Sequence, residues 1–346
     1  MTIAGAASWL LSAEVHSSQP ETGDYARDLS RLPLWLLVLA PAAAFGAMAW
    51  WILRGATSTG ASEAFIATPE FVLWLLILCA QASFWILALG YVAGTVFRRT
   101  KDLRSRGLLT PGRVLPLAAS LLALIVLPAL VVSSGEDTPL RHIPAKGQFP
   151  LADNEAKITP IVVLGLAIGF LAIVGMWAAT MALNRLRPNG QPSAELLGRF
   201  LALRREVGAL LSVAGTLVGL ATLSSGALRL AVLAANQEPY FAGLPPTEEL
   251  EFASGYVLAY GLFFTGLLAI AFAPSFLAMR AAGDRLRDAA HPLVAPNHPN
   301  FADVVAKRNG LDAVLQTNLS ASATFKAGAA ILTPLAGSLV ALVLPT

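Results

Sequence analysis

The stretch of sequence that decides the fold is Arg205–Arg229, which reads REVGALLSVAGTLVGLATLSSGALR. Small residues recur along it at alternating steps of three and four, so on an α-helix they form one stripe. At about 1.5 Å of rise per residue the stretch spans about 36 Å, a bilayer core with part of its interfaces. Gly215 and Gly219 form a GxxxG, a spacing that lets two helix backbones touch in lipid. We therefore expect a transmembrane helix whose stripe packs against protein or lies at a pore axis. The stripe consists of Gly208, Ser212, Gly215, Thr216, Gly219, Thr222 and Gly226.

The composition assigns the class of protein. Hydrophobic residues make up 56% of the chain and charged residues 13%, with a mean hydropathy of +0.65. A soluble domain has about one-quarter charged residues, so this chain is predicted to be an all-α polytopic membrane protein. The single cysteine cannot form an intramolecular disulfide, and the four histidines are scattered over hydrophilic segments. Neither pattern indicates a metal site, and we expect no metal and no cofactor.

Seven apolar runs are long enough to cross a bilayer. Residues 33–344 therefore form the predicted transmembrane domain, and residues 1–32 an N-terminal cytoplasmic segment. An interfacial helix around Trp9 and an irregular start are both open for that segment. The predicted spans are 33–53, 71–97, 114–133, 160–183, 207–235, 253–278 and 327–344.

The distribution of positive charge predicts the orientation. If the N-terminus is cytoplasmic, residues 1–32 and the loops 98–113, 185–206 and 279–326 carry 19 of the 24 lysines and arginines. The positive-inside rule then places the N-terminus in the cytoplasm and the C-terminus outside. A bacterial inner membrane is the expected location.

Spans two, five and six are predicted to continue as helices into the cytosol. Ser193 is a suitable N-cap for a helix that begins at Ala194 and runs into the stripe. Phe301–Leu319 has helical periodicity and predicts a short amphipathic helix. This helix would lie on the inner membrane interface or close the group of cytosolic helix extensions. Charged pairs at i,i+4 spacing support the extensions. They are Glu195–Arg199, Asp102–Arg106 and Arg280–Asp284.

Catalytic chemistry is not expected. No run carries a charged residue or a histidine well inside it, although intramembrane ionisable groups usually mark proton or ion pathways. Neither a P-loop nor a GxGxxG fingerprint occurs. Gln81 and Ser83 are the candidate cavity residues, with an interhelical hydrogen bond as the structural alternative for Gln81. The chain is therefore predicted not to be an enzyme.

The cytoplasmic arginines are candidate ligands for an anion. Positive loops are required by topology alone, but arginines on rigid helices also suit phosphate recognition. A nucleotide, an anionic lipid and a nucleic acid all remain open as the partner. The candidate residues are Arg98, Arg99, Arg104, Arg106, Arg199, Arg204 and Arg205.

The leading functional hypothesis is a homo-oligomeric channel or pore. It would open when an anionic cytosolic ligand, such as a nucleotide signal, binds the arginines; a phage-defence membrane effector would fit. One alternative is a secondary transporter or facilitator, because spans two to seven show a faint repeat of helical hairpins with a period near 90 residues. Another is a non-transporting scaffold subunit of a larger complex.

Overall fold

A computed structural model gives the arrangement of the chain. It describes residues 34–54, 56, 60–105, 107, 151, 154–188, 190–238, 254–315, 329, 331–333, 335–336 and 339. The chain divides into two compact units, Met1–Val38 and Leu39–Thr346. Of the first unit only the start of one helix, residues 34–38, is described, and the contacts below lie within the second unit. The predicted span 114–133 and most of 327–344 lie outside the described residues.

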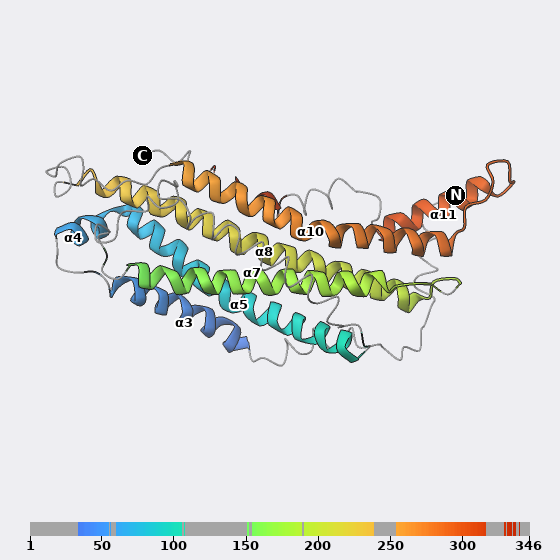
Figure 1. Ribbon diagram of the computed structural model, residues 1–346, viewed down its shortest axis with the longest axis horizontal. Helices are drawn as coiled ribbons and strands as arrows, with labels where there is room; N and C mark the ends of the chain where they lie inside the picture. Colours follow the sequence, from blue (N-terminus) through green and yellow to red (C-terminus); the bar gives the residue numbers. More distant parts are fainter. Residues whose placement is uncertain are drawn as a thin grey trace. The chain divides into compact units, whose positions relative to one another are not determined.

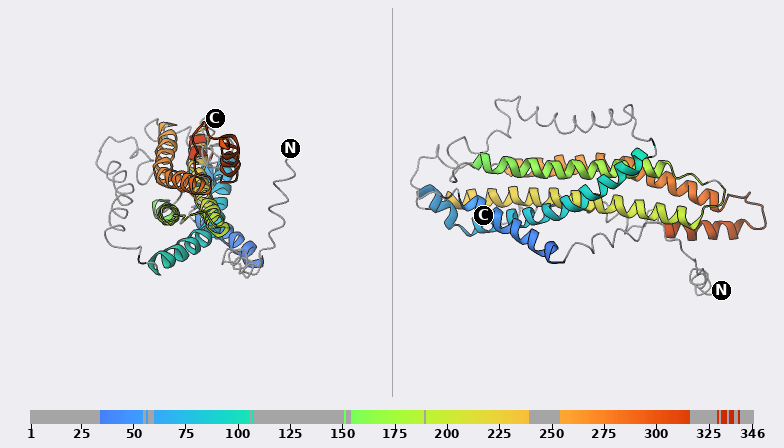
Figure 2. Two further views of the ribbon diagram at one scale, coloured as in Figure 1. Left: turned by 90° about the vertical axis from the view of Figure 1, so that its right-hand side faces the viewer. Right: turned by 90° about the horizontal axis from the view of Figure 1, so that it is seen from below.

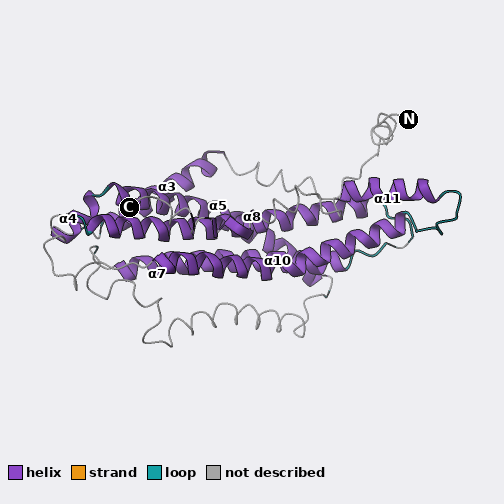
Figure 3. Ribbon diagram, turned by 90° about the horizontal axis from the view of Figure 1, so that it is seen from above, coloured by secondary structure: helices purple, strands orange, loops and turns teal. Residues whose placement is uncertain are grey.

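All regular structure in the described residues is α-helical (Figure 3). Four helices are long and apolar enough to cross a membrane, namely α5, α7, α8 and α10. This agrees with the predicted helical membrane protein. The helices are α3 (Leu34–Leu53), α4 (Gly60–Ala67), α5 (Pro69–Ser105), α7 (Asn154–Asn184), α8 (Ala194–Ala235), α10 (Ser254–Ala290) and α11 (Phe301–Leu315).

Three of the long helices continue beyond their apolar runs, as the sequence predicts. Helix α5 continues to Ser105, α10 continues to Ala290, and α8 begins at Ala194. The Ser193 hydroxyl accepts a hydrogen bond from the Leu196 N–H at 3.2 Å, which is the predicted N-cap. Helix α11 begins at Phe301 as expected, and the residues after Leu315 lie outside the description.

Helices α7 and α8 form the central pair of the bundle. They contact each other, and both contact α5 and α10 (Figures 1 and 2). Half of the apolar stretch of α8 is buried, against 22% of that of α10. The α7–α8 contact is close at Gly175, where an added Cβ would lie 2.9 Å from Leu210 Cδ1. The predicted role of the fifth span as the central packing helix is thus met by α8.

Hydroxyl groups join neighbouring helices inside the apolar region. Thr180 on α7 and Ser275 on α10 share a hydrogen bond of 2.8 Å, and Ser275 also donates to the Met176 carbonyl at 3.3 Å. Ser275 follows Pro274, which lacks an N–H and leaves one carbonyl of α10 without its helical donor. Such interhelical bonds tie helices together where apolar burial offers little driving force.

A buried lysine lies near the start of α7. Lys157 is only 7% exposed, and its ammonium lies 3.5 Å from the Ile52 carbonyl. That carbonyl belongs to the last turn of α3. A cation at a helix C-terminus is favourable because the last carbonyls have no helical donors.

Candidate functional site

Most of the described ion pairs lie at one end of the helices, which we call the charged end (residues 98–105, 185–206 and 279–315). Three contacts bring its segments together. Arg99 on α5 binds Glu206 on α8, Arg204 on α8 donates to the Leu315 carbonyl of α11, and the Gln191 amide donates to the Ala290 carbonyl at 3.2 Å. Segments far apart in the sequence therefore form one polar region.

The contact between Arg99 and Glu206 is a bidentate ion pair. Arg99 Nε lies 2.8 Å from Glu206 Oε1 and 3.0 Å from Oε2, and its Nη2 binds Oε2 as well. The two side chains are 20% and 15% exposed. This fork geometry is the strongest form of an arginine–carboxylate contact. Sequence reasoning missed Glu206, although it is a carboxylate placed directly before an apolar run, within one turn of two arginines.

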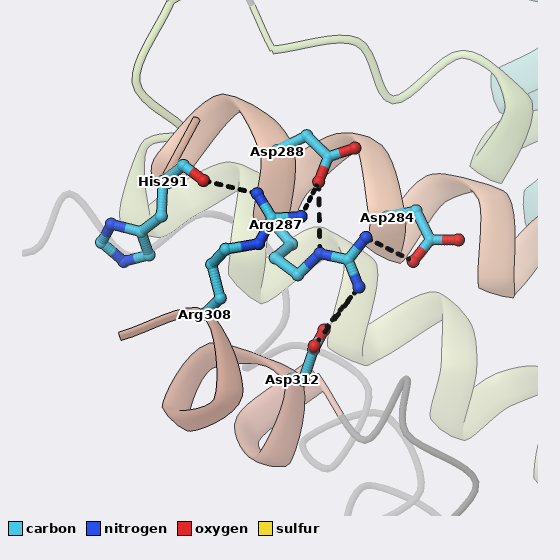
Figure 4. Close-up of polar contacts among 6 residues, drawn as sticks. All are labelled: Asp284, Arg287, Asp288, His291, Arg308 and Asp312. Carbon is cyan, nitrogen blue, oxygen red and sulfur yellow. Dashed lines mark hydrogen bonds and ion pairs between the residues drawn. The ribbon is translucent and has the colours of Figure 1, made fainter. Parts of the chain in front are cut away.

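Arg287 on α10 is the centre of a second charged group. It contacts Asp284 at 3.1 Å, Asp288 at 3.2 Å and Asp312 of α11 at 3.3 Å (Figure 4). Asp312 is only 4% exposed, so the arginine supplies the positive charge that a buried carboxylate needs. Burial alone would lower the pKa of Arg287, but its bonds to Asp312 and Asp288, with the charges of Asp312 and Asp284, raise that pKa overall.

Arg308 on α11 binds back to α10. Its guanidinium lies 2.5 Å from Asp288 Oδ1 and donates to the His291 carbonyl at 2.6 Å (Figure 4). Burial would raise the pKa of the Asp288 carboxyl, but the hydrogen bonds and charges of Arg308 and Arg287 lower that pKa below its ordinary value. The two arginines and their carboxylates attach α11 to the end of α10, and we call them the α10–α11 cluster. Its residues are Asp284, Arg287, Asp288, His291, Arg308 and Asp312.

The C-terminal end of α11 is attached to α8. The Arg204 guanidinium donates to the Leu315 carbonyl, one of the last carbonyls of α11, and the Leu315 side chain is fully buried. Burial lowers the pKa of the Arg204 guanidinium below its ordinary value. A guanidinium on a C-terminal carbonyl stabilises a helix end. The second half of helix α11 is therefore held by both α10 and α8.

The predicted anion-binding arginines differ in their surroundings. Arg99 binds Glu206, Arg204 binds the Leu315 carbonyl, and Arg199 binds Glu195 at 2.6 Å as predicted. Arg98, Arg104, Arg199 and Arg205 are exposed, and the Arg106 side chain lies outside the described residues. Anion binding by these arginines stays a prediction.

One predicted pair differs from the structure. Asp284 binds Arg287 at i,i+3 in place of the expected Arg280 at i−4, because Arg287 also reaches Asp288 and Asp312 and so joins a larger group of carboxylates. The expected Asp102–Arg106 pair involves a residue outside the description.

The stripe on α8 divides into two parts. Its members from Gly219 onward are buried, as is Gly215, whereas Gly208, Ser212 and Thr216 are exposed. An added Cβ at Gly219 would collide with Thr333 Cγ2, while one at Gly208 would meet nothing within 4 Å. At Gly219 the stripe therefore faces a residue of the same chain, from the predicted last span. The buried members are Gly215, Gly219, Thr222 and Gly226.

The two predicted cavity residues have different surroundings. The Ser83 hydroxyl contacts the Pro41 carbonyl of α3 at 2.8 Å and the Cys79 carbonyl at 3.0 Å, so it joins α5 to α3. Gln81 is only 4% exposed, and within the described part of the chain its Oε1 atom has no hydrogen-bond partner, like Nε1 of Trp85. Each unsatisfied buried group costs about 1–3 kcal/mol. Thr265 Oγ1 on α10 is in the same state, but only the amide and the indole lie one turn apart on one helix.

These features define the class of the protein. It is a helical membrane protein with four described helices able to cross a bilayer and with an ion-paired end that docks a short helix. In the described ranges no group of three histidine, cysteine or carboxylate side chains could hold a metal ion. No protein-family model matches the chain, and no curated protein or solved structure is significantly similar to it.

Proposed function

We propose that this chain is a seven-span protein of a bacterial inner membrane that assembles into a homo-oligomeric channel. An anionic cytosolic ligand, such as a nucleotide signal, opens it at the charged end. In this topology the N-terminus and the charged end face the cytoplasm, and the C-terminus lies outside. A membrane effector in phage defence is one setting in which such a channel would act.

The observation that carries this proposal is the exposed half of the stripe on the central helix. Gly208, Ser212 and Thr216 lie on one face of α8, within its apolar run, and Gly208 has open space above it. In lipid, small and hydroxyl residues favour contact with another helix over contact with acyl chains. A second copy of the chain on this face would place its own hydroxyls beside these. A shared axis lined by hydroxyls follows from that packing.

The exposed arginines support the anionic ligand. Arg205 lies one turn before Gly208 and is exposed, as are Arg98 and Arg104 on α5. Guanidinium groups on helices present planar donors that match phosphate oxygens. The ligand would therefore bind beside the first turn of the exposed stripe.

Helix α11 offers a route from the ligand to the stripe. Arg204, the neighbour of Arg205, holds the last turn of α11, and the chain after α11 leads to Thr333, which lies on Gly219. A ligand that draws Arg204 away from the Leu315 carbonyl would loosen α11. Thr333, which covers Gly219, would then be free to shift.

Ion flux through liposomes tests the proposal. The purified chain is reconstituted, and potassium efflux is measured with adenosine triphosphate, a cyclic dinucleotide or inorganic polyphosphate added. We expect efflux with at least one of these anions and an oligomeric mass in detergent. A monomeric mass, or no efflux with any of the three, contradicts the channel. Saturable counterflow of a solute without conductance would favour the facilitator instead.

A pair of glycine variants separates the stripe from general effects. Gly208→Leu fills the exposed stripe, and Gly198→Leu makes the same change on α8 before the apolar run, where an added Cβ also meets nothing within 4 Å. We expect the first variant to lose the oligomer and the flux, and the second to keep both. Equal behaviour of the two variants would contradict an assembly through the stripe.

Topology is tested separately with a membrane-impermeant thiol reagent. Cysteines introduced at Arg104 and at Gln237, both exposed and at opposite ends of the helices, are labelled in intact cells and in inverted vesicles. We expect Gln237→Cys to react in intact cells and Arg104→Cys only in inverted vesicles. The reverse pattern would contradict the orientation.

A further inference from the structure

The buried face of α5 forms a regular seam with one polar interruption. Its residues follow alternating steps of four and three, the spacing by which one helix presents a seam to its neighbours. Between Trp74 and Val92, Gln81 is the only seam residue that carries an amide, and one turn later Trp85 adds an indole N–H. Both side chains are at least nine-tenths buried. The seam runs through Trp74, Leu78, Gln81, Trp85, Ala88 and Val92.

The unpartnered atoms of this seam are complementary. Within the described chain, Gln81 Oε1 and Trp85 Nε1 have no hydrogen-bond partner. An amide oxygen only accepts hydrogen bonds, and an indole N–H only donates one. The two residues are four apart, so their Cβ atoms lie about 5–6 Å from each other on the same face of the helix. A donor and an acceptor are thus placed side by side in an apolar core.

The neighbouring helix restricts the indole. Gly165 of α7 lies against the ring, since an added Cβ there would be 3.3 Å from Trp85 Cζ2 and 3.8 Å from Cε2. Cε2 is bonded to the indole nitrogen, so the N–H lies next to the part of the ring that faces α7. A glycine at this position leaves room beside that edge which any side chain would occupy.

We propose that Gln81 and Trp85 hold one water molecule between them, inside the bundle and at membrane depth. The indole N–H donates to the water oxygen, and the water donates to Gln81 Oε1. Two hydrogen bonds of about 2.9 Å that meet at a tetrahedral oxygen join atoms about 4.7 Å apart, which suits side chains on consecutive turns. Buried waters characteristically satisfy such otherwise unpaired polar groups.

This site is distinct from the proposed pore. It belongs to the seam that α5 presents to α7 and α8, whereas the exposed stripe lies on another face of α8. A water at this position ties α5 into the bundle within a single subunit. It depends neither on assembly nor on the anionic ligand.

Solid-state NMR on the full chain in lipid tests the proposal. Indole nitrogens are labelled with ¹⁵N, the Trp85 signal is assigned by its loss in Trp85→Phe, and polarisation transfer from water to each indole N–H is measured. We expect rapid transfer from bound water to the Trp85 N–H and an at least several-fold slower transfer in Gln81→Leu. Ser83→Ala, whose hydroxyl is directed to α3, is the matched control and keeps the wild-type rate.

Two results would overturn the proposal. The first is the absence of water transfer to Trp85 in the folded wild-type chain, together with a short Trp85 Nε1–Gln81 Cδ distance, which means that the side chains bond directly. The second is an unchanged transfer rate in Gln81→Leu, which means that Gln81 does not hold the water. If Gln81→Leu does not fold, Gln81→Met removes the same acceptor. The Trp85 Nε1–Gln81 Cδ distance in the wild-type chain tests the proposal without any variant.

Discussion

Gly219 on α8 lies directly beneath the side chain of Thr333, so closely that a single added methyl group would collide with Thr333 Cγ2. The two residues are 114 positions apart, and their contact occupies the GxxxG of the central helix. A motif often associated with dimers is therefore used, at this residue, within one chain.

Gly219→Ala should destabilise the fold. The new Cβ meets a β-branched residue whose side chain has little rotamer freedom, and overpacking of this kind costs about 1–3 kcal/mol. Thermal unfolding in detergent should show a lower midpoint. Gly208→Ala is the matched control on the same helix, because its added Cβ meets nothing within 4 Å. Equal midpoints for the two variants would show that the Thr333 contact contributes nothing.

Breaking the Arg99–Glu206 pair on one side should cost more than removing both residues. Either single alanine variant leaves one charge partly buried without its partner. Buried pairs lose about 3–5 kcal/mol in this way and exposed pairs about 0–1, so an intermediate loss of about 1–3 kcal/mol is expected. A double-mutant cycle by denaturant unfolding measures the coupling. Additive single effects would contradict a direct pair, and the exchanged pair Arg99→Glu with Glu206→Arg should restore part of the stability.

Replacement of Arg204 should loosen α11. Arg204→Met keeps the aliphatic stem but removes the donor to the Leu315 carbonyl. A hydrogen bond from a charged donor is worth about 1.5–3 kcal/mol, so amide hydrogen exchange in the last turn of α11 should rise about ten-fold or more. Arg205→Met is the control, since Arg205 is exposed. Unchanged exchange in Arg204→Met would mean that α11 is held by the α10–α11 cluster alone.

Acid should release α11 from α10. The pKa of Asp288 is lower in the folded chain than its ordinary value of 3.8, so folding favours the ionised carboxylate. The stabilisation is therefore complete above about pH 4 to 5 and is lost as the pH falls through the folded-state pKa. Because the Asp288 side chain is 56% exposed, solvent screens much of this effect.

Hydrogen exchange of α11 as a function of pH, corrected for the intrinsic exchange rate, measures this release. Protection should be constant from pH 5 to 8 and fall below pH 4. Asp288→Asn should lower protection at pH 7 and weaken the acid response. An acid response identical to that of the wild type would assign it to other carboxylates of the cluster.

The helices themselves could be predicted from local sequence. Ser193 supplies an N-cap, and the helix begins at the next residue because its hydroxyl satisfies a backbone N–H that no helical carbonyl can reach. The long proline-free run from Phe71 likewise predicted that α5 would outlast its apolar segment. Caps, prolines and apolar periodicity act over one or two turns, and a single segment contains all of that information.

The sequence by itself therefore determined the class of the protein, most of its long helices and the end at which positive charge collects. It did not predict α4, and it placed the start of α7 at residue 160 and not at Asn154. Only the tertiary structure decided that Glu206 binds Arg99, that Arg204 binds the end of α11, and that Thr333 covers Gly219 while Gly208 stays open. Such partners depend on how each helix is rotated and how far it is shifted along its neighbour. A shift of one residue moves a side chain by about 100° around the helix axis, and no local pattern carries that choice.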